Sequence, residues 1–149
     1  MRIVVQRVTR ATVHSEGELL GEIGAGAVVL AGIGHDDTPE IVDRMADKVI
    51  GLRYFEDAEG RTNLAIGDTG GSLLMVSQFT LYADLRRGRR PGFTAAALPE
   101  AAVPLVDRFV ERLRASVPVE TGRFGAEMAV ELVNHGPFTL VLDSERDLA

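Results

Sequence analysis

Residues 77–81, with the sequence SQFTL, combine hydroxyl and amide side chains within an otherwise apolar stretch. Each of these polar groups needs a hydrogen-bond partner if it is buried. A Thr hydroxyl such as that of Thr80 is a nucleophile only beside a base, and no His lies in the segment. For each residue alone a structural role is favoured, because Thr is a good strand former. The clustering of Ser77, Gln78 and Thr80 is what indicates a site.

The second candidate is a basic stretch between residues 86 and 93. Its cations are Arg86, Arg87, Arg89 and Arg90. The Gly and Pro residues around them favour a loop, and the planar guanidinium fork suits phosphate oxygens. Phe93 adds a ring on which a base could stack. The alternative is a solvated loop with no ligand, which the stretch taken alone favours.

The third candidate is the pair Gly136–Pro137 between two expected strands. An X–Pro bond is cis in about 5–6% of cases, typically in a tight turn. In that geometry consecutive carbonyls can point the same way and form a rigid pair of acceptors without any side chain. The alternative is an ordinary hairpin proline, which the residues taken alone favour.

The composition excludes several kinds of catalytic site. The chain has no Cys, so it has no disulfide, no thiolate nucleophile and no Cys-ligated zinc. Its three His residues, His14, His35 and His135, do not have the spacing of a helical metal site. No GxSxG elbow, Walker loop or dinucleotide-binding GxGxxG motif is present. We therefore expect neither a metal nor a cofactor.

Length and charge place these segments in a single acidic domain. A chain of 149 residues fits one domain over residues 1–149, and 46% hydrophobic residues predict a globular core. The net charge of −6 opposes non-specific coating of nucleic acid, yet residues 77–94 carry +3 and the remainder −9. No apolar run approaches the roughly 20 residues of a membrane span, and no signal peptide is visible. We expect a cytoplasmic protein with one local basic patch and no membrane contact.

Hydrophobic periodicity predicts the elements that must position these segments. Thr38 as N-cap predicts an amphipathic helix over residues 39–51, and a second helix starts between residues 99 and 103 and ends near residue 115. Residues 67–71 are expected to be a turn, and residues 134–137 a turn that joins two strands. The expected strands are residues 3–8, 11–15, 18–23, 27–33, 53–55, 61–64, 72–84, 128–133 and 138–142. Because hairpins dominate, we predict the α/β (α+β) class, with a mainly antiparallel twisted β-sheet and helices packed on it.

Taken together, these segments resemble the D-aminoacyl-tRNA deacylase (D-tyrosyl-tRNA deacylase) family over almost the entire chain. The two specific motifs are SQFTL at residues 77–81 and N-x-G-P-x-T at residues 134–139, with Arg90–Pro91 between them. The other matching stretches are QRVTRA (6–11), GEIGAG (21–26), the DAEG turn, GGSLLMVSQFTLYAD, RGRRPGF, FVERLR and TGRF (121–124). Two such signatures in the proper order are not expected by chance.

The resemblance implies a barrel-like fold, a homodimer with two equivalent sites near the subunit interface, and a reaction. Members of the family hydrolyse the ester that joins a D-amino acid to the 3′-terminal adenosine of tRNA, and they also clear glycine from mischarged tRNA. The chain would then be a carboxylic ester hydrolase that proofreads chirality in translation and spares L-aminoacyl-tRNA.

The resemblance also assigns catalytic roles. Ser77, Gln78, Phe79 and Thr80 would surround the scissile ester, with the backbone N–H groups of Gln78 and Phe79 stabilising the oxyanion. Thr80 would position the substrate rather than attack it, and the 2′-hydroxyl of the adenosine would assist the water. The basic stretch at residues 86–93 would approach the phosphates of the acceptor stem.

Further roles concern substrate binding. The resemblance implies a cis bond between Gly136 and Pro137, which would enter the pocket of the partner subunit. Their carbonyls would bind the α-ammonium group and form a wall that excludes an L side chain. Arg7 would hold this loop in place, and Phe124 and Met128 would lie near the adenine.

His135 departs from the family pattern, because Asp is common at this position of N-x-G-P. We expect the change to be tolerated if the chemistry uses backbone carbonyls, although an imidazole could alter the charge of the loop below neutral pH. Gly92 is a second difference and leaves a more flexible loop. Two other hypotheses stay open: a nucleic-acid-binding module that hydrolyses nothing, and a structural dimer whose SQFT segment only satisfies an interface.

Overall fold

The computed structural model describes all 149 residues and contains a mixed β-sheet, a small separate hairpin and four α-helices. The strands are β1 (Arg2–Ser15), β2 (Glu18–Ile23), β3 (Gly26–Gly32), β4 (Arg53–Glu56), β5 (Thr62–Ala65), β6 (Ser72–Ser77), β7 (Val119–Thr121) and β8 (Ala129–Asp143). The helices are α1 (Pro39–Gly51), α2 (Ile66–Thr69), α3 (Pro99–Arg114) and α4 (Ser144–Asp147), and a 3₁₀ turn, η1 (Phe79–Tyr82), follows β6.

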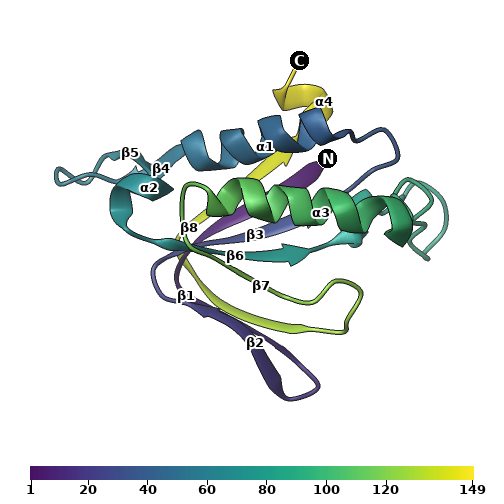
Figure 1. Cartoon of the computed structure of the whole chain (residues 1–149), viewed down its shortest axis with the longest axis horizontal. Coiled ribbons are helices and arrows are strands. Elements are labelled where there is room, and N and C mark those ends of the chain that lie inside the picture. Colours follow the sequence, from purple (N-terminus) through teal and green to yellow (C-terminus); the bar gives the residue numbers. More distant parts are fainter.

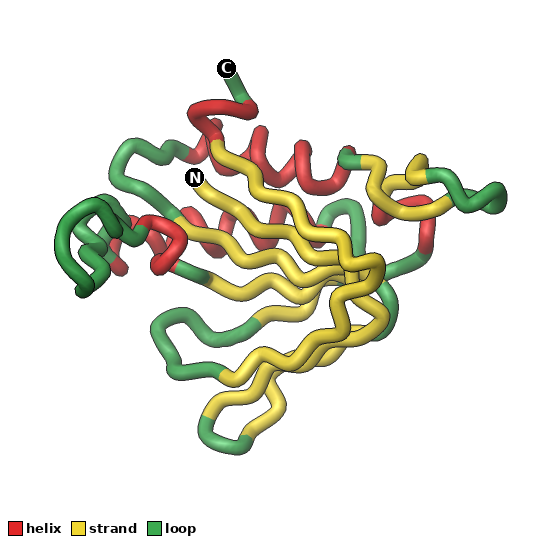
Figure 2. Tube along the Cα trace, turned by 180° about the vertical axis from the view of Figure 1, so that it is seen from behind, coloured by secondary structure: helices red, strands yellow, loops and turns green.

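β1 is the central strand of the sheet. Its first half pairs with β3 and its second half with β2, both antiparallel, while β8 follows its other side along nearly the whole length. β3, β6 and β7 continue the sheet with parallel pairing. β2 and β7, at the two ends of this strand order, lie against each other, so the sheet curls into a nearly closed barrel (Figures 1 and 2).

The alternation of side chains along the strands separates two apolar cores. Val29 of β3 and Met75 of β6 face α1 and α3, which cover one face of the sheet in Figure 1. Val28 and Leu74, one residue earlier in each strand, point the other way into a smaller core inside the barrel. β3 and β6 are therefore buried on both faces, which explains their continuous apolar sequences.

The two long helices begin where the sequence predicts. The Thr38 hydroxyl accepts a hydrogen bond from the Ile41 N–H at 3.3 Å, and Pro39 occupies the first turn of α1. α3 starts at Pro99, the earlier end of the expected range. No helix in the protein is long and apolar enough to cross a membrane.

The predicted strand over residues 72–84 is only partly correct. β6 ends at Ser77, and the chain then turns into η1, where the Leu81 N–H donates to the Gln78 carbonyl at 3.2 Å. This turn packs against Gly32 of β3: an added Cβ there would lie 2.7 Å from the Gln78 carbonyl oxygen, so only glycine leaves room. A tertiary contact therefore ends a strand that the residue propensities would continue.

β8 is one strand rather than two strands joined by a turn. Residues 129–143 pair with β1 at both ends, and the register shifts at two places, between Gln6 and Val8, where residues 135–138 stand opposite Arg7, and between Val8 and Ala11. The turn predicted at residues 134–137 is therefore wrong. The chain bulges there and continues in the same direction afterwards.

Two smaller elements also differ from the prediction. Residues 67–69, expected to belong to a glycine-rich turn, lie in α2, and residues 119–121 form the unexpected strand β7. The sheet is mainly antiparallel, as predicted, but the β3–β6 and β6–β7 pairs are parallel. Parallel pairs join strands that are distant along the chain, so local periodicity carries no signal for them.

Candidate active site

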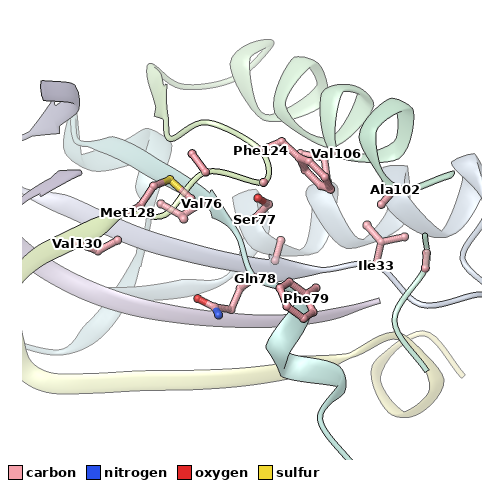
Figure 3. A pocket seen from close by; sticks show the side chains of 14 residues that line it. Ile33, Val76, Ser77, Gln78, Phe79, Ala102, Val106, Phe124, Met128 and Val130 are labelled. Carbon is pink, nitrogen blue, oxygen red and sulfur yellow. The ribbon is translucent and has the colours of Figure 1, made fainter. Parts of the chain in front are cut away.

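A pocket of about 240 Å³ opens where β6 ends, between α3 and the loop that precedes β8 (Figure 3). Five of the residues predicted from the sequence line it, namely Ser77, Gln78, Phe79, Phe124 and Met128. Figure 3 shows Phe124 beside Val106 of α3, and Met128 beside Val76 of β6. The pocket therefore brings together two segments that are far apart in the sequence.

None of the fourteen residues that line the pocket has an ionisable side chain. Eleven of them are hydrophobic, and only Ser77 and Gln78 have polar side chains. Such a lining suits a flat apolar group such as a nucleobase. From this chain, the pocket has no side chain that could act as a general acid or base.

The backbone at the start of η1 supplies further polar groups. The Gln78 N–H donates to the Ala31 carbonyl at 2.8 Å, so it is already used and does not fit the predicted role of oxyanion donor. Phe79 is the first residue of η1, and its N–H has no acceptor within that turn. The candidate backbone donor is therefore Phe79 rather than the predicted pair.

Thr80 lies on the exposed side of η1 and does not line the pocket. Its hydroxyl accepts a hydrogen bond from Nε2 of Gln78. An amide N–H cannot take up a proton, so this contact does not activate the hydroxyl as a nucleophile. Tyr82, the one titratable residue of η1, is no better as a base, because burial raises the pKa of its hydroxyl.

Phe124 and Met128 are connected through the loop that carries them. The Arg123 N–H donates a hydrogen bond to the Met128 sulfur at 3.4 Å. This bond holds Arg123, the residue before Phe124. The Arg123 side chain pairs with Glu18 of β2 at 3.2 Å. The thioether therefore helps to hold the aromatic ring at the pocket.

Gly136 and Pro137 lie in the β8 bulge, away from the pocket of their own chain. Both are exposed, neither lines the pocket, and the peptide bond between them is cis, as the resemblance implies. Gly136 has a φ of +131°, and an added Cβ would lie 3.0 Å from Nη2 of Arg7. Glycine is therefore required here. Within one chain, the two signature motifs do not form a single site.

Arg7 packs under this bulge and is only 6% exposed. Its Nε donates to the His135 carbonyl at 3.0 Å, and its Nη1 donates to the Tyr54 carbonyl at 2.8 Å. The guanidinium carbon lies 4.8 Å from the centre of the Phe138 ring. These contacts connect the bulge to β1 and β4.

Asn134 and Thr139 close the two ends of the bulge, and neither was predicted to be a site residue. The Asn134 side chain donates from Nδ2 to the Thr139 hydroxyl at 2.8 Å and accepts the Phe138 N–H at 3.0 Å. This clamp explains why Asn and Thr flank Gly-Pro in the N-x-G-P-x-T motif. The spacing of the two polar residues is the signal from which it could have been inferred.

The basic stretch lies in a loop over residues 84–92, here called the arginine loop. Asp84 and Gly92 exchange two backbone hydrogen bonds of 2.7 and 3.0 Å at its base. Arg86 folds back onto Asp84, and its hydrogen bonds hold the pKa of that carboxyl well below the usual range. The other three cations, Arg87, Arg89 and Arg90, are exposed and form no ion pair.

Comparisons with known proteins match this architecture. The family model described as D-Tyr-tRNA(Tyr) deacylase matches residues 4–143. The D-aminoacyl-tRNA deacylase of Symbiobacterium thermophilum is 58% identical, over 98% of this chain and 97% of its own length. A solved structure titled "c-Myc DNA Unwinding Element Binding Protein" has a TM-score of 0.91 at 39% identity and covers 96% of this chain and 98% of that chain. Another, titled "Structural Analysis of a probable eukaryotic D-amino acid tRNA deacylase", shares the fold, with a TM-score of 0.80 at 17% identity over 95% of this chain and 97% of that chain.

The fold and these matches define a class of protein, the hydrolases that act on the ester bond of aminoacyl-tRNA. The chain belongs to the D-Tyr-tRNA(Tyr) deacylase family. Its substrate is accordingly tRNA that carries a D-amino acid, and its reaction is a step of translation quality control. Membership favours the enzyme over the two other hypotheses, the non-catalytic module and the structural dimer.

Proposed function

We propose that the protein removes D-amino acids and glycine from tRNA and spares L-aminoacyl-tRNA by excluding the L side chain at Gly136–Pro137. The terminal adenosine enters the pocket with its base near Phe124 and Met128, and the ester lies at residues 77–79. The observation that carries this proposal is the pocket itself. It has aromatic and thioether surfaces and a backbone donor at its edge, and it has no ionisable side chain.

Hydrolysis in such a pocket proceeds by direct attack of water on the ester carbonyl. As the new C–O bond forms, the carbonyl electron pair moves onto oxygen, and the Phe79 N–H stabilises this oxyanion. Collapse then breaks the bond to the 3′-oxygen, which receives the proton that the water loses. The neighbouring 2′-hydroxyl of the adenosine relays that proton, because no side chain in the pocket does so. Thr80 keeps Gln78 in position and does not attack.

The stereochemical selection uses the carbonyls of Gly136 and Pro137 as acceptors for the α-ammonium group. With the ester, the ammonium group and the Cα hydrogen held, inversion at Cα drives an L side chain into the backbone wall, whereas a D side chain points away. Glycine has no side chain to exclude. Because the wall is made of backbone, one enzyme accepts many different D-residues.

This selection requires a second copy of the chain. Gly136 and Pro137 are exposed in the bulge, outside the pocket of their own chain, while Arg7 holds the bulge in a defined shape. A homodimer in which each bulge enters the pocket of the partner brings the two motifs together. Val133 and Val141, exposed on the same strand, supply apolar surface for that contact.

The direct test is to incubate the purified protein with D-tyrosyl-tRNA, L-tyrosyl-tRNA and glycyl-tRNA, and to follow ester loss against an enzyme-free control. We expect rapid loss of the D-tyrosyl and glycyl esters, with the L-tyrosyl ester lost only at the spontaneous rate. Equal hydrolysis of the two tyrosyl esters would contradict the exclusion mechanism. Binding of tRNA without any ester loss would contradict the enzymatic function.

A subunit-mixing experiment tests the shared site. Ala126→Trp fills the pocket, and Gly136→Ala places a Cβ against Nη2 of Arg7 and displaces the bulge. Each variant alone should lose activity, whereas a mixture after subunit exchange should recover part of it, because one site of each mixed dimer is intact. Absence of recovery, with mixed dimers shown by mass spectrometry, would place both motifs within one chain.

A further inference from the structure

Two aromatic side chains lie exposed beside the pocket, Phe79 of η1 and Phe93 just after the arginine loop. Their ring centres are 5.1 Å apart and their planes meet at 73°, an edge-to-face pair. Phe79 is 57% exposed and Phe93 is 36% exposed, whereas rings of this size are normally removed from water. Phe79 also lines the pocket. The pair therefore continues the apolar lining of the pocket onto the outer surface.

The segment that carries Phe93 is tied to the end of β3. His35 Nε2 lies 2.7 Å from the Thr94 carbonyl oxygen, and the Ala97 N–H donates to the Ile33 carbonyl at 2.9 Å. The other ring belongs to η1, which packs against the same strand end. Both rings are thus held in place without a ligand, as in a preorganised binding surface.

Three exposed arginines that form no ion pair lie in the adjoining loop. Arg87, Arg89 and Arg90 have no carboxylate partner, and the loop stands out against a remainder that carries −9. A ligand with flat apolar faces and a negative backbone satisfies the rings and the cations together. Single-stranded nucleic acid is the ligand with that chemistry.

We propose that Phe79 and Phe93 form a stacking site for the unpaired nucleotide that precedes the terminal adenosine of the tRNA, with its phosphate facing the arginine loop. This inference rests on the proposed binding of the terminal adenosine in the adjacent pocket. A pocket of about 240 Å³ accommodates one nucleoside, so the preceding nucleotide lies outside it. Stacking on an aromatic ring tolerates any base, because every base has a π-face.

The test substitution is Phe93→Leu, which keeps an apolar side chain and removes the ring. We expect the KM for D-tyrosyl-tRNA to rise about 5- to 100-fold with kcat nearly unchanged, since stacking contributes to binding. The 3′-D-tyrosyl ester of adenosine alone lacks the preceding nucleotide, so the rise in KM should be absent for that substrate. Phe93→Tyr, which retains a ring, should restore the KM for the tRNA. Leu19→Ala removes an exposed apolar side chain elsewhere and serves as the matched control.

Two further measurements separate stacking from charge and from folding. The loss in Phe93→Leu should persist at high salt, whereas phosphate contacts weaken there. An RNA with 2-aminopurine in place of the preceding base should lose fluorescence on binding the wild type and lose less on binding the variant.

The outcomes distinguish this inference from the proposed function. An unchanged KM for the tRNA, or equal losses on the tRNA and the adenosine ester, overturns the stacking site. Failure of the wild type to hydrolyse either D-ester overturns the proposed function instead.

Discussion

Ser77 and Gln78 are the only polar side chains that line the pocket, and neither takes up a proton at neutral pH. Burial also keeps the nearby Tyr82 protonated, because it raises the pKa of the hydroxyl. At the scale of the residue, the side chains of the pocket therefore offer hydrogen bonds and apolar contacts to a ligand. In the proposed mechanism, the substrate and water supply the groups that carry protons.

Thr80→Val separates a positioning role from a nucleophilic one. The substitution removes the hydroxyl that accepts the Gln78 amide, which is about one hydrogen bond, so kcat for D-tyrosyl-tRNA should fall by no more than about tenfold. Loss of a covalent nucleophile would bring the rate close to the spontaneous rate. Single-turnover deacylation measures the difference, and Thr80→Ser should keep nearly the full rate.

A tRNA that ends in 2′-deoxyadenosine tests the proton relay. Without the neighbouring hydroxyl, the enzyme-catalysed rate should fall by about 100-fold or more, the size expected for loss of a general acid–base group. The enzyme-free rate of the same deoxy ester is the baseline to subtract. Hydrolysis at an undiminished rate would show that the proton is moved by another group.

At the scale of the element, the pocket depends on η1 more than on any regular strand. β6 delivers the chain to Ser77, and the short turn then places Phe79 at the pocket and presents its N–H. This geometry exists only because β3 leaves room at Gly32 for the Gln78 carbonyl. Gly32 of β3 thus permits the conformation of the turn η1 that follows β6.

Gly32→Ala should disturb the pocket without touching the substrate. Its Cβ would lie 2.7 Å from the Gln78 carbonyl oxygen, so η1 must shift. We expect kcat/KM to fall at least tenfold and the free energy of unfolding to fall by about 1–3 kcal/mol, as in other overpacked sites. Gly51→Ala, where nothing lies within 4 Å of the added Cβ, is the control: it should leave kcat/KM unchanged and should not lower the free energy of unfolding.

Two bidentate ion pairs join α1 and α3. They should affect how the stability of the protein falls as the pH becomes acidic. Asp43 pairs with Arg108 and Asp47 with Arg112, at 2.7–2.9 Å, and the arginine hydrogen bonds lower the pKa of each carboxyl. The pKa of these carboxyls is lower in the folded protein than in the unfolded chain, where it is about 4, so the ion pairs stabilise the folded state at pH values above about 4. This contribution is lost as the pH falls through the lower pKa of the folded protein.

The prediction concerns the double variant Arg108→Gln/Arg112→Gln. At pH 7 its thermal midpoint should lie below that of the wild type by a few degrees at most, because exposed pairs are weak. As the pH falls from about 4 through the lowered pKa of the folded carboxyls, the two midpoints should converge, since the carboxylates become protonated in both proteins. A difference that stays constant from pH 7 to pH 2 would show that the arginines act through packing instead.

At the scale of the whole molecule, positive charge is concentrated in one loop, while the rest of the chain is acidic. The net charge is −6, yet the arginine loop presents exposed cations next to the pocket. Only part of that loop is available, because Arg86 is already neutralised by Asp84. If the loop binds tRNA as proposed, the acidic remainder would disfavour other orientations of the bound RNA.

The triple variant Arg87→Gln/Arg89→Gln/Arg90→Gln should weaken tRNA binding in a salt-dependent manner. If each cation neutralises one phosphate, the slope of log Kd against log salt should become less steep by about 2 to 3. Filter binding of tRNA across a range of salt concentrations measures the slope. Arg86→Gln is the matched control from the same loop, and it should change the slope by less than any of the other three single substitutions.

Much of the candidate site was predictable, because its residues lie within short stretches of the sequence. SQFTL singles out polar residues within an apolar stretch, Gly136–Pro137 stands out as an X–Pro junction between strands, and the arginines cluster within a few positions. The sequence also determined α1 through its cap and periodicity, and the neighbouring strands 11–15 and 18–23 that form the β1–β2 hairpin. These features depend on neighbouring residues, whose physics is local.

Tertiary structure alone decided how those segments are used. The end of β6 depends on Gly32, the use of the Gln78 N–H depends on the Ala31 carbonyl, and the β8 bulge depends on Arg7. Each is a contact between residues that are distant in the chain. Hydrophobic periodicity and residue propensity depend on neighbouring residues, so they do not predict such contacts. The sequence by itself therefore determined which residues have unusual chemistry, whereas packing decided which of them meet, because meeting is a property of the whole fold.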